Sequence, residues 1–422
     1  MISFEQALEK ILSHIDVLKE ERRPILDCLG QVLAEDVCSG INVPPWDNSA
    51  MDSYAVQSKD TYNASPNSPR FLSVVGTVAA GYVSQHEVKP GTAIRIMTGA
   101  PIPKGADSVV SFEDTNEALR KGPSSEVGIL HKVKSGSNIR QAGEYIAAGS
   151  TVLRQGTPIG PLEVGILASL GRTTVAVIRR PVVAILATGD ELEDINQPLS
   201  AGKVYNSSTY SLAAMVRHCG GVPNILGVAS DREDLLIGRI HQGLNADMLV
   251  TTGGTSAGDY DLIKDVLAKE GEIIFETVRI RPGKSLAFGK IKGFGNGGIA
   301  RNMPLLALPG NPVGSMVAFE LFARPAILKM MGKINLDRPS IEAVLEDSIV
   351  NSDGFRIFAL ARVEKRGGQY SVRLNGRRGA GVLTSITSAN GLVTVPEDKA
   401  KVEKGDKVQV LMLDWNESTE AI

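Results

Sequence analysis

The chain has 422 residues, which at roughly 100–200 residues per domain predicts two to four domains. Hydrophobic residues make up 43% and charged residues 22% of the sequence, which is typical of a soluble globular protein and excludes a disordered chain. Lysine and arginine number 45 against 47 for aspartate and glutamate, so the net charge of -2 excludes a broad basic surface for nucleic acid or an anionic membrane.

Cysteine and histidine are too scattered to predict a disulfide scaffold or a zinc site. Cys28, Cys38 and Cys219 form no CxxC pair, and the 5 histidines form no HxxxH pair. The first residues lack the basic and apolar segments of a leader, and no run approaches the roughly 18 apolar residues of a membrane span. We therefore expect a cytoplasmic protein whose metal, if it has one, is held by oxygen ligands.

The first segments along the chain predict a helix and then a β-rich insert. Apolar residues recur every three or four positions from Phe4 to Leu18, after a candidate capping box of Ser3 and Gln6, which predicts a helix over residues 4–20. From residue 43 to about 140, short β-like runs alternate with Gly and Pro. These runs are 71–75, 92–97, 108–112 and 128–133.

A second helix is predicted over 162–170, and alternating strands and helices follow it. Such alternation predicts parallel strands with crossover helices, an open α/β sheet. The alternating segments are 182–187, 208–219, 224–228, 232–244, 248–252 and 260–269. Three more strands and a long helix are then expected at 273–280, 286–291, 305–308 and 313–331. After Gly332, runs of period two predict a small all-β domain.

Polar residues and glycines are concentrated in the loops after these predicted strands. In an open parallel sheet ligands bind beyond the carboxyl ends of the strands, where these loops meet. Gly253, Gly254 and Gly258 would let the main chain approach a phosphate or another oxyanion. The loop carboxylates offer hard oxygens for Mg²⁺, which suggests cleavage of a phosphoanhydride. These carboxylates are Asp190, Glu191, Asp231, Asp259 and Asp261.

Three features of the same region have alternative interpretations. Taken singly, each loop aspartate is equally consistent with a helix N-cap. Arg279, Arg281 and Lys284 are cations without an evident partner in the sequence, and a solvated edge strand would also explain them. Residues 254–258 match GxSxG, which would make Ser256 a hydrolase nucleophile. The last histidine, His241, precedes this serine, so a serine hydrolase is only a distant alternative.

Long motifs along nearly the whole chain resemble the molybdopterin molybdenumtransferase family of molybdenum cofactor biosynthesis, the MoeA and gephyrin E-domain group. These motifs are DNSAMDSYAV (47–56), RIMTGAP (95–101), TGDE (188–191), TGGTSAGDYD (252–261), PGK (282–284) and LPGNP (308–312). The resemblance implies a multidomain α/β plus β protein. Its central domain would hold an open, mostly parallel α/β sheet of the MogA type.

On the family's layout, the segments above form four domains. Residues 1–42 and 141–178 would be an elongated linking domain of helical and mixed structure, and 43–140 the β-rich insert. Residues 179–332 would be the molybdopterin-binding α/β domain, and 333–422 a small β-barrel-like domain.

The implied activity is a transferase reaction that inserts molybdenum from molybdate into adenylylated molybdopterin, with Mg²⁺-dependent release of AMP. The resemblance also implies a homodimer with an active site shared between subunits, and molybdopterin adenylyltransferase as the upstream partner. Departures from the family's motifs leave open a tungstate-using enzyme or a low-activity paralogue that acts as a scaffold. These departures are Ser53, Tyr145, Asn206 and Ser285.

The resemblance, together with the loop chemistry and the physical assignment of Mg²⁺ to the loop carboxylates, predicts the following site. The catalytic residues would be Asp52, Glu191, Asp231, Asp261 and Lys284. The metal ligands among them would be Glu191, Asp231 and Asp261. The substrate-binding positions would be Thr98, Arg140, Gly253, Gly254, Ser256, Gly258, Arg281, Pro309, Asn311 and Pro312. We expect Lys284 and Arg281 to offset oxyanion charge, and Asp52 to complete the site from the other subunit.

Overall fold

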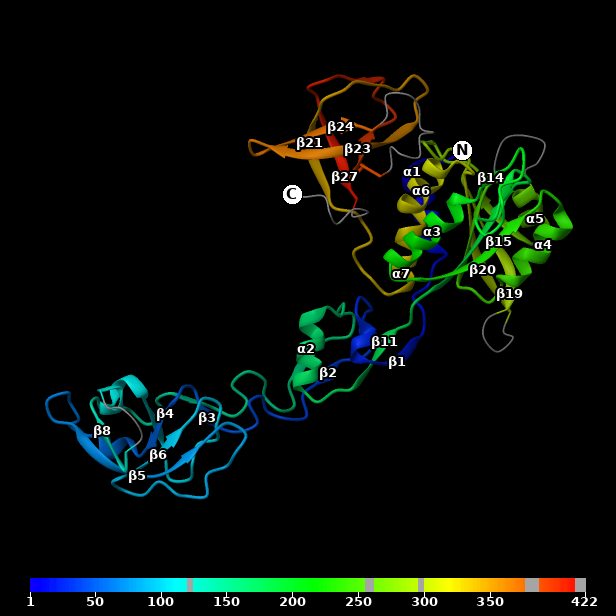
Figure 1. Cartoon of the computed structure of the whole chain (residues 1–422). Coiled ribbons are helices and arrows are strands. Elements are labelled where there is room, and N and C mark those ends of the chain that lie inside the picture. The colour runs from blue at the N-terminus through cyan, green and yellow to red at the C-terminus, as the bar shows by residue number, and fades with distance from the viewer. Residues whose placement is uncertain (120–123, 255–261, 295–299, 376–386, 414–422) are drawn as a thin grey trace. The chain divides into compact units, whose positions relative to one another are not determined.

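The computed structural model describes residues 1–119, 124–254, 262–294, 300–375 and 387–413. The chain forms two compact units (Figure 1). The large unit contains residues 1–22, 30–34 and 176–422, and the small unit contains residues 23–29 and 35–175. The chain passes from one unit to the other within β1 (Glu20–Pro24), on either side of residues 30–34, and within β11 (Thr174–Ile178). None of the described helices is long and apolar enough to span a membrane.

A six-stranded sheet forms the centre of the large unit. In spatial order its strands are β15 (Val222–Ala229), β12 (Val182–Thr188), β16 (Met248–Thr252), β20 (Ala300–Leu308), β19 (Ala287–Phe294) and β17 (Gly271–Phe275). The first four strands are parallel neighbours, whereas β19 pairs antiparallel with both β20 and β17. The predicted open, mostly parallel sheet is therefore confirmed.

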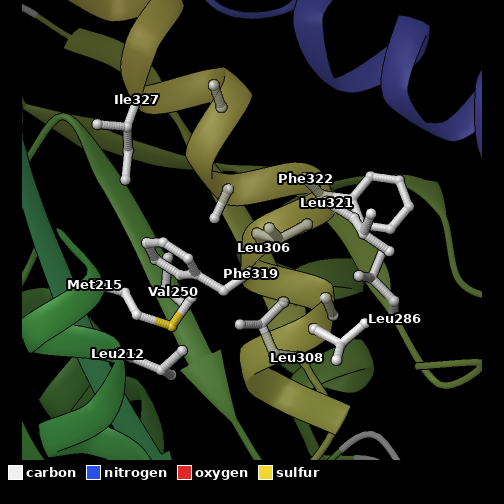
Figure 2. Close-up of a cluster of buried hydrophobic side chains, with 14 of the residues drawn as sticks. Leu212, Met215, Val250, Leu286, Leu306, Leu308, Phe319, Leu321, Phe322 and Ile327 are labelled. Atoms are coloured by element: carbon white, nitrogen blue, oxygen red, sulfur yellow. The ribbon is translucent and has the colours of Figure 1, made fainter. Parts of the chain in front are cut away.

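Helices cover both faces of this sheet. Side chains alternate along each strand, so each buried strand has apolar residues on both faces. Val183 and Ile185 of β12 belong to one core cluster and Ala184 and Leu186 to the other. The first cluster packs against α1 (Phe4–Ser13), α3 (Ser207–His218), α6 (Pro312–Ala318) and α7 (Arg324–Met330). The second packs against α4 (Glu233–Gln242) and α5 (Leu262–Glu270). Figure 2 shows Phe319 beside Met215 in the first cluster.

The N-terminal helix is shorter than its apolar period predicts. The Ser3–Gln6 capping box is present, but the helix ends at Ser13 with His14 as C-cap, rather than at residue 20. Ile15 is only 2% exposed in the same core cluster, so the apolar period continues outside the helix. The backbone N–H of Leu18 donates to Met330 O at 2.9 Å, which fixes this non-helical segment.

The C-terminal part of the large unit is a closed barrel of five strands. The period-two runs predicted an all-β domain here, and the resemblance implied its barrel-like form. In spatial order these strands are β23 (Arg356–Arg366), β24 (Gln369–Leu374), β21 (Ser340–Leu345), β27 (Lys407–Met412) and β25 (Gly391–Val395), and β25 pairs again with β23. The short strand β18 (Ile280–Arg281) pairs parallel with β23 and so joins the barrel to the α/β region. A separate pair is β22 (Ile349–Val350) with β26 (Lys401–Val402).

The small unit is built on a five-stranded sheet, as the β-rich insert predicted. In order its strands are β7 (Ser108–Ser111), β4 (Ser53–Val56), β6 (Thr92–Ile96), β5 (Arg70–Val78) and β8 (Glu126–Ile129). Two strand pairs and one helix complete the unit: β3 (Asn48–Ser49) with β9 (Ile139–Arg140), β2 (Val37–Cys38) with β10 (Thr151–Leu153), and α2 (Pro161–Ser169). The division of the chain into four domains stays a prediction.

Candidate functional site

The loops after β12, β15, β16 and β20 line one cavity of about 440 Å³ at the carboxyl edge of the parallel strands. Its lining residues are Thr188, Gly189, Glu191, Asp231, Gly253, Gly254, Ser285, Pro309, Gly310 and Asn311. Six of the predicted site residues are thus brought together: Glu191, Asp231, Gly253, Gly254, Pro309 and Asn311. Ser256, Gly258 and Asp261 lie outside the described residues.

The floor of this cavity is main chain, and Gly253 shows why a side chain is excluded there. Its φ is +92°, and a Cβ atom at this position would lie 2.4 Å from Thr188 O. The backbone N–H of Gly253 donates to Leu308 O at 3.3 Å, and Thr252 Oγ1 donates to Pro309 O at 3.0 Å. The loops after β16 and β20 are therefore held against each other, and the backbone lies open to a ligand.

Asn311 begins helix α6 at the same edge. Its Oδ1 accepts from the backbone N–H groups of Val313 at 3.0 Å and Gly314 at 3.2 Å, and Pro312 occupies the first helical turn. The LPGNP segment therefore forms a fixed turn before a helix. The same turn places Pro309 and Asn311 on the cavity wall, so a structural role and a place at the cavity are compatible.

The carboxylates of the cavity are positioned by a reciprocal contact between two loops. The backbone N–H of Asp190 donates to Asp231 Oδ2 at 3.4 Å, and that of Asp231 donates to Asp190 Oδ1 at 3.3 Å. Lys203 donates to the carbonyl oxygen of Asp190. Asp190 thus holds the loops after β12 and β15 together, while Glu191 and Asp231 line the cavity.

Glu191 and Asp231 have the donor chemistry that Mg²⁺ requires, because both offer carboxylate oxygens to one cavity. The third predicted ligand, Asp261, lies outside the described residues. Within the described part of the chain, no three side chains of His, Cys, Asp or Glu are grouped as a metal centre. The predicted metal set therefore stays a prediction.

A second cavity of about 240 Å³ adjoins the first and shares Thr188, Glu191 and Gly310 with it. It is bounded by β13 (Leu192–Glu193), β14 (Val204–Tyr205), the start of α3 and Pro312. Thr188 is 4% exposed, and its Oγ1 has no hydrogen-bond partner among the described residues. Thr188 is the last residue of β12, and this strand-end position is the signal by which the sequence could have predicted it as a cavity residue.

Asn206 also lines the second cavity. It is one of the departures from the family motif and is 2% exposed. Its Oδ1 accepts from the backbone N–H of Thr209 at 3.2 Å, and its Nδ2 lies 2.9 Å from Thr209 Oγ1. Asn206 therefore caps α3, a role that an aspartate would fill equally well.

The cationic segment near the site differs from its expectation. Arg281 forms an ion pair with Asp353, so the expectation of a cation without a partner is wrong for this residue. Lys284 Nζ lies 5.5 Å from the ring centroid of Phe355. Of the segment 281–285, Ser285 is the residue that lines the larger cavity. Asp353 could not be found from the sequence, because its contact is between distant segments.

The remaining predicted residues lie in the small unit. Asp52 is exposed, and its Oδ1 accepts from Thr98 N at 2.8 Å and Thr98 Oγ1 at 2.9 Å. The backbone bond, and then the hydroxyl bond, hold the pKa of the Asp52 carboxyl below its usual range. Arg140 pairs with Asn48 across β3 and β9 and donates to Ala50 O at 3.4 Å. The catalytic and substrate-binding roles of these residues stay predictions.

A buried polar cluster that the sequence did not predict lies beside the five-stranded sheet of the small unit, around Tyr54 of β4. Tyr54 donates to Glu117, whose other oxygen lies 3.1 Å from Arg95. Burial, together with the Glu117 contact, raises the pKa of Tyr54 to about 12. Arg95 also carries a favourable charge interaction with Asp52. A lone tyrosine in a β run gave no signal of such a group.

Three family models match the chain in order: the MoeA N-terminal region over residues 2–171, a probable molybdopterin binding domain over residues 184–329, and the MoeA C-terminal region over residues 342–413. Molybdopterin molybdenumtransferase 2 of Mycobacterium tuberculosis is 36% identical over 396 residues, which cover 92% of this chain and 93% of that protein. The molybdopterin molybdenumtransferase of Bacillus subtilis is 35% identical over 389 residues, covering 92% of this chain and 88% of its own.

The crystal structure of a molybdopterin biosynthesis MoeA protein from Pyrococcus horikoshii matches the fold with a TM-score of 0.82. It is 30% identical in sequence, and the match covers 98% of this chain and 99% of that one. The motifs, the fold and these relatives agree along the length of the chain. The chain therefore belongs to the molybdopterin molybdenumtransferase family, which is a family of transferases of molybdenum cofactor biosynthesis.

Proposed function

We propose that this chain inserts molybdenum from molybdate into adenylylated molybdopterin and releases AMP. The observation that carries the proposal is the cavity of about 440 Å³ in which Glu191 and Asp231 lie around the bare main chain of Gly253 and Gly254. A phosphoanhydride needs room close to the main chain for its oxygens and acidic groups for metal and water. The glycines of this cavity leave that room, and Glu191 and Asp231 supply the acidic groups.

Cleavage of the anhydride consumes one water molecule. The water oxygen bonds to the adenylyl phosphorus, the bond from this phosphorus to the bridging oxygen breaks, and AMP and the pterin phosphate separate with release of two protons. Glu191 or Asp231 can accept the first proton, because a carboxylate in hydrogen-bond reach of water acts as a general base. Both also would hold Mg²⁺, with Asp261 by resemblance, and Mg²⁺ when bound neutralises charge on the anhydride oxygens.

In the insertion step two Mo–S bonds form to the dithiol sulfurs of the pterin, one Mo–O bond breaks, and this oxygen leaves as water with the two thiol protons, with no change in the oxidation state of molybdenum. The remaining groups would bind molybdate and complete the site. Lys284 and Arg281 supply the positive charge that a dianion needs. We infer a homodimer in which Asp52, Thr98 and Arg140 belong to the site of the other subunit, and molybdopterin adenylyltransferase as the enzyme that supplies the substrate. These two inferences rest on the family resemblance.

The test is a direct assay of the purified protein with adenylylated molybdopterin, Mg²⁺ and either molybdate or tungstate. We expect AMP release that requires both Mg²⁺ and the oxyanion, and a faster reaction with molybdate. A faster reaction with tungstate would indicate that the protein inserts tungsten instead of molybdenum. Absence of AMP release under all these conditions would reject the transferase reaction in favour of a scaffold role.

A further inference from the structure

We propose that Asp353 of the barrel is an internal counter-ion that sets the affinity of the cation turn, residues 281–284, for a tetrahedral dianion. The inference rests on the proposed function, because it takes this turn as the place where the oxyanion binds. It adds a residue to which neither the family motifs nor the resemblance assigns a role.

Two residues of one barrel loop contact the two cations of the turn. The carboxylate of Asp353 pairs with the guanidinium of Arg281, and their side chains are 30% and 50% exposed. The ring of Phe355 lies 5.5 Å from Lys284 Nζ. A ring at this distance attracts a cation without neutralising it, whereas a carboxylate neutralises it. The two cations of the turn are therefore not equivalent toward an incoming anion.

Ladder bonds and a buried asparagine hold the loop in register with the turn. Strands β18 and β23 pair Ile280 with Arg356, and the backbone N–H of Arg356 donates to Arg279 O at 3.0 Å. Asn351, which is 3% exposed, donates through Nδ2 to Phe355 O at 2.9 Å. The Arg281–Asp353 contact is thus fixed by backbone structure on both sides.

The ion pair contributes little to stability, because solvent screening and the ordering of two side chains offset most of the attraction in a partly exposed pair. Its effect on an anion is larger. A tetrahedral dianion that takes a bidentate contact with Arg281 must first displace the Asp353 carboxylate or accept its repulsion. The pair therefore weakens binding of every anion, and a dianion with two strong acceptor oxygens competes best with the carboxylate.

The test compares Asp353→Asn with Asp398→Asn in the full-length protein. Both changes remove one carboxylate charge from the barrel, and Asp398 is exposed. Binding of labelled molybdate, without any pterin, is measured by equilibrium dialysis. We expect the Kd of Asp353→Asn for molybdate to fall about three- to tenfold and that of Asp398→Asn to equal the parent value. In the Arg281→Ala background, adding Asp353→Asn should not lower the Kd for molybdate any further.

The outcomes separate this inference from the proposed function. An unchanged or raised Kd in Asp353→Asn, while the parent binds molybdate and Lys284→Ala does not, overturns the counter-ion and leaves the transferase intact. Absence of molybdate binding in the parent and in Asp353→Asn also overturns the counter-ion, and AMP release then decides the proposed function by itself. A gain that persists in the Arg281→Ala background shows that Asp353 does not act through Arg281.

Discussion

Glu191 is the side chain on which the proposed chemistry depends most directly, because it lines both cavities at the sheet edge. We expect Glu191→Gln to lower AMP release at least about a hundredfold, since the amide can neither accept a proton nor hold Mg²⁺ as a carboxylate does. Glu193→Gln is a matched control two residues along, where the carboxylate accepts from exposed Ser200 at 3.1 Å and does not line the larger cavity. Equal losses in the two variants would contradict the assignment.

The Asp52–Thr98 contact predicts a pH effect in the small unit. Because the folded-state pKa of Asp52 is lowered, its contribution to stability is present above its unfolded pKa and is lost as the pH falls through the folded value, below about 4. Thr98→Val removes the hydroxyl bond of 2.9 Å and keeps the backbone bond, so the pKa of Asp52 should rise part of the way to its usual value.

Carboxyl-carbon NMR titration measures this pKa directly. Thr92→Val on strand β6 is the control, because its hydroxyl donates to Lys89 O at 2.8 Å and is not bonded to Asp52. The pKa of Asp52 should be the same in this variant as in the parent protein. A value that is also unchanged in Thr98→Val would mean that the hydroxyl bond contributes nothing to the carboxylate.

Sequence reasoning brought to one cavity the residues whose positions follow from strand order, and it missed contacts that are defined by long-range pairs. Glu191 and Asp231 directly follow parallel strands, and the topology alone brings such residues to one edge. Asp353 reaches Arg281 only through the β18–β23 pairing, which no local pattern encodes. Thr98 was predicted to contact substrate, and in the structure its backbone N–H and its hydroxyl both donate to Asp52.

At the scale of elements, the turn after β16 leaves no room for a side chain at Gly253. We expect Gly253→Ala to destabilise the protein by about 1–3 kcal/mol, because its φ of +92° and the 2.4 Å approach to Thr188 O both penalise a Cβ atom. Gly165→Ala in the middle of α2 is the opposite case, since nothing lies within 4 Å of the added carbon. It should stabilise by about 0.5–1 kcal/mol through helix propensity.

Urea unfolding of the two glycine variants beside the parent protein measures both effects. Far-UV circular dichroism before unfolding shows whether each variant retains its secondary structure. The interpretation of the β16 turn would be wrong if Gly253→Ala were as stable as the parent protein. A loss of stability in Gly165→Ala would mean that the interior of α2 is more crowded than its open surroundings indicate.

Element types followed from the sequence more closely than element ends did. Strand β16 begins and ends at the predicted residues, because β-branched residues fill it and glycines follow. The predicted helix over 313–331 is instead α6, a π turn over Phe319–Ala323, and α7. The turn holds buried Glu320, which pairs with Arg338 at 2.6 Å, and this distant partner lies outside any local pattern.

For the whole molecule, the two compact units divide the predicted site residues between them. Asp52, Thr98 and Arg140 belong to the small unit, and Glu191 and Asp231 to the large unit. Composition and periodicity could predict several domains, but they contain no information about which copy of the chain supplies which half of a site. That assignment comes from the family resemblance and can be tested by mixing two variants of the protein.

Mixing two inactive variants provides that test. If each site combines the small unit of one subunit with the large unit of its partner, Asp52→Ala and Glu191→Ala homodimers are inactive but a mixed dimer has one intact site. Random reassociation gives about half mixed dimers, so activity should return to about a quarter of the parent value. If both residues serve a site within one subunit, no pairing of the variants restores AMP release. Light scattering of the same samples measures whether the chain is a dimer, because recovery of activity requires one.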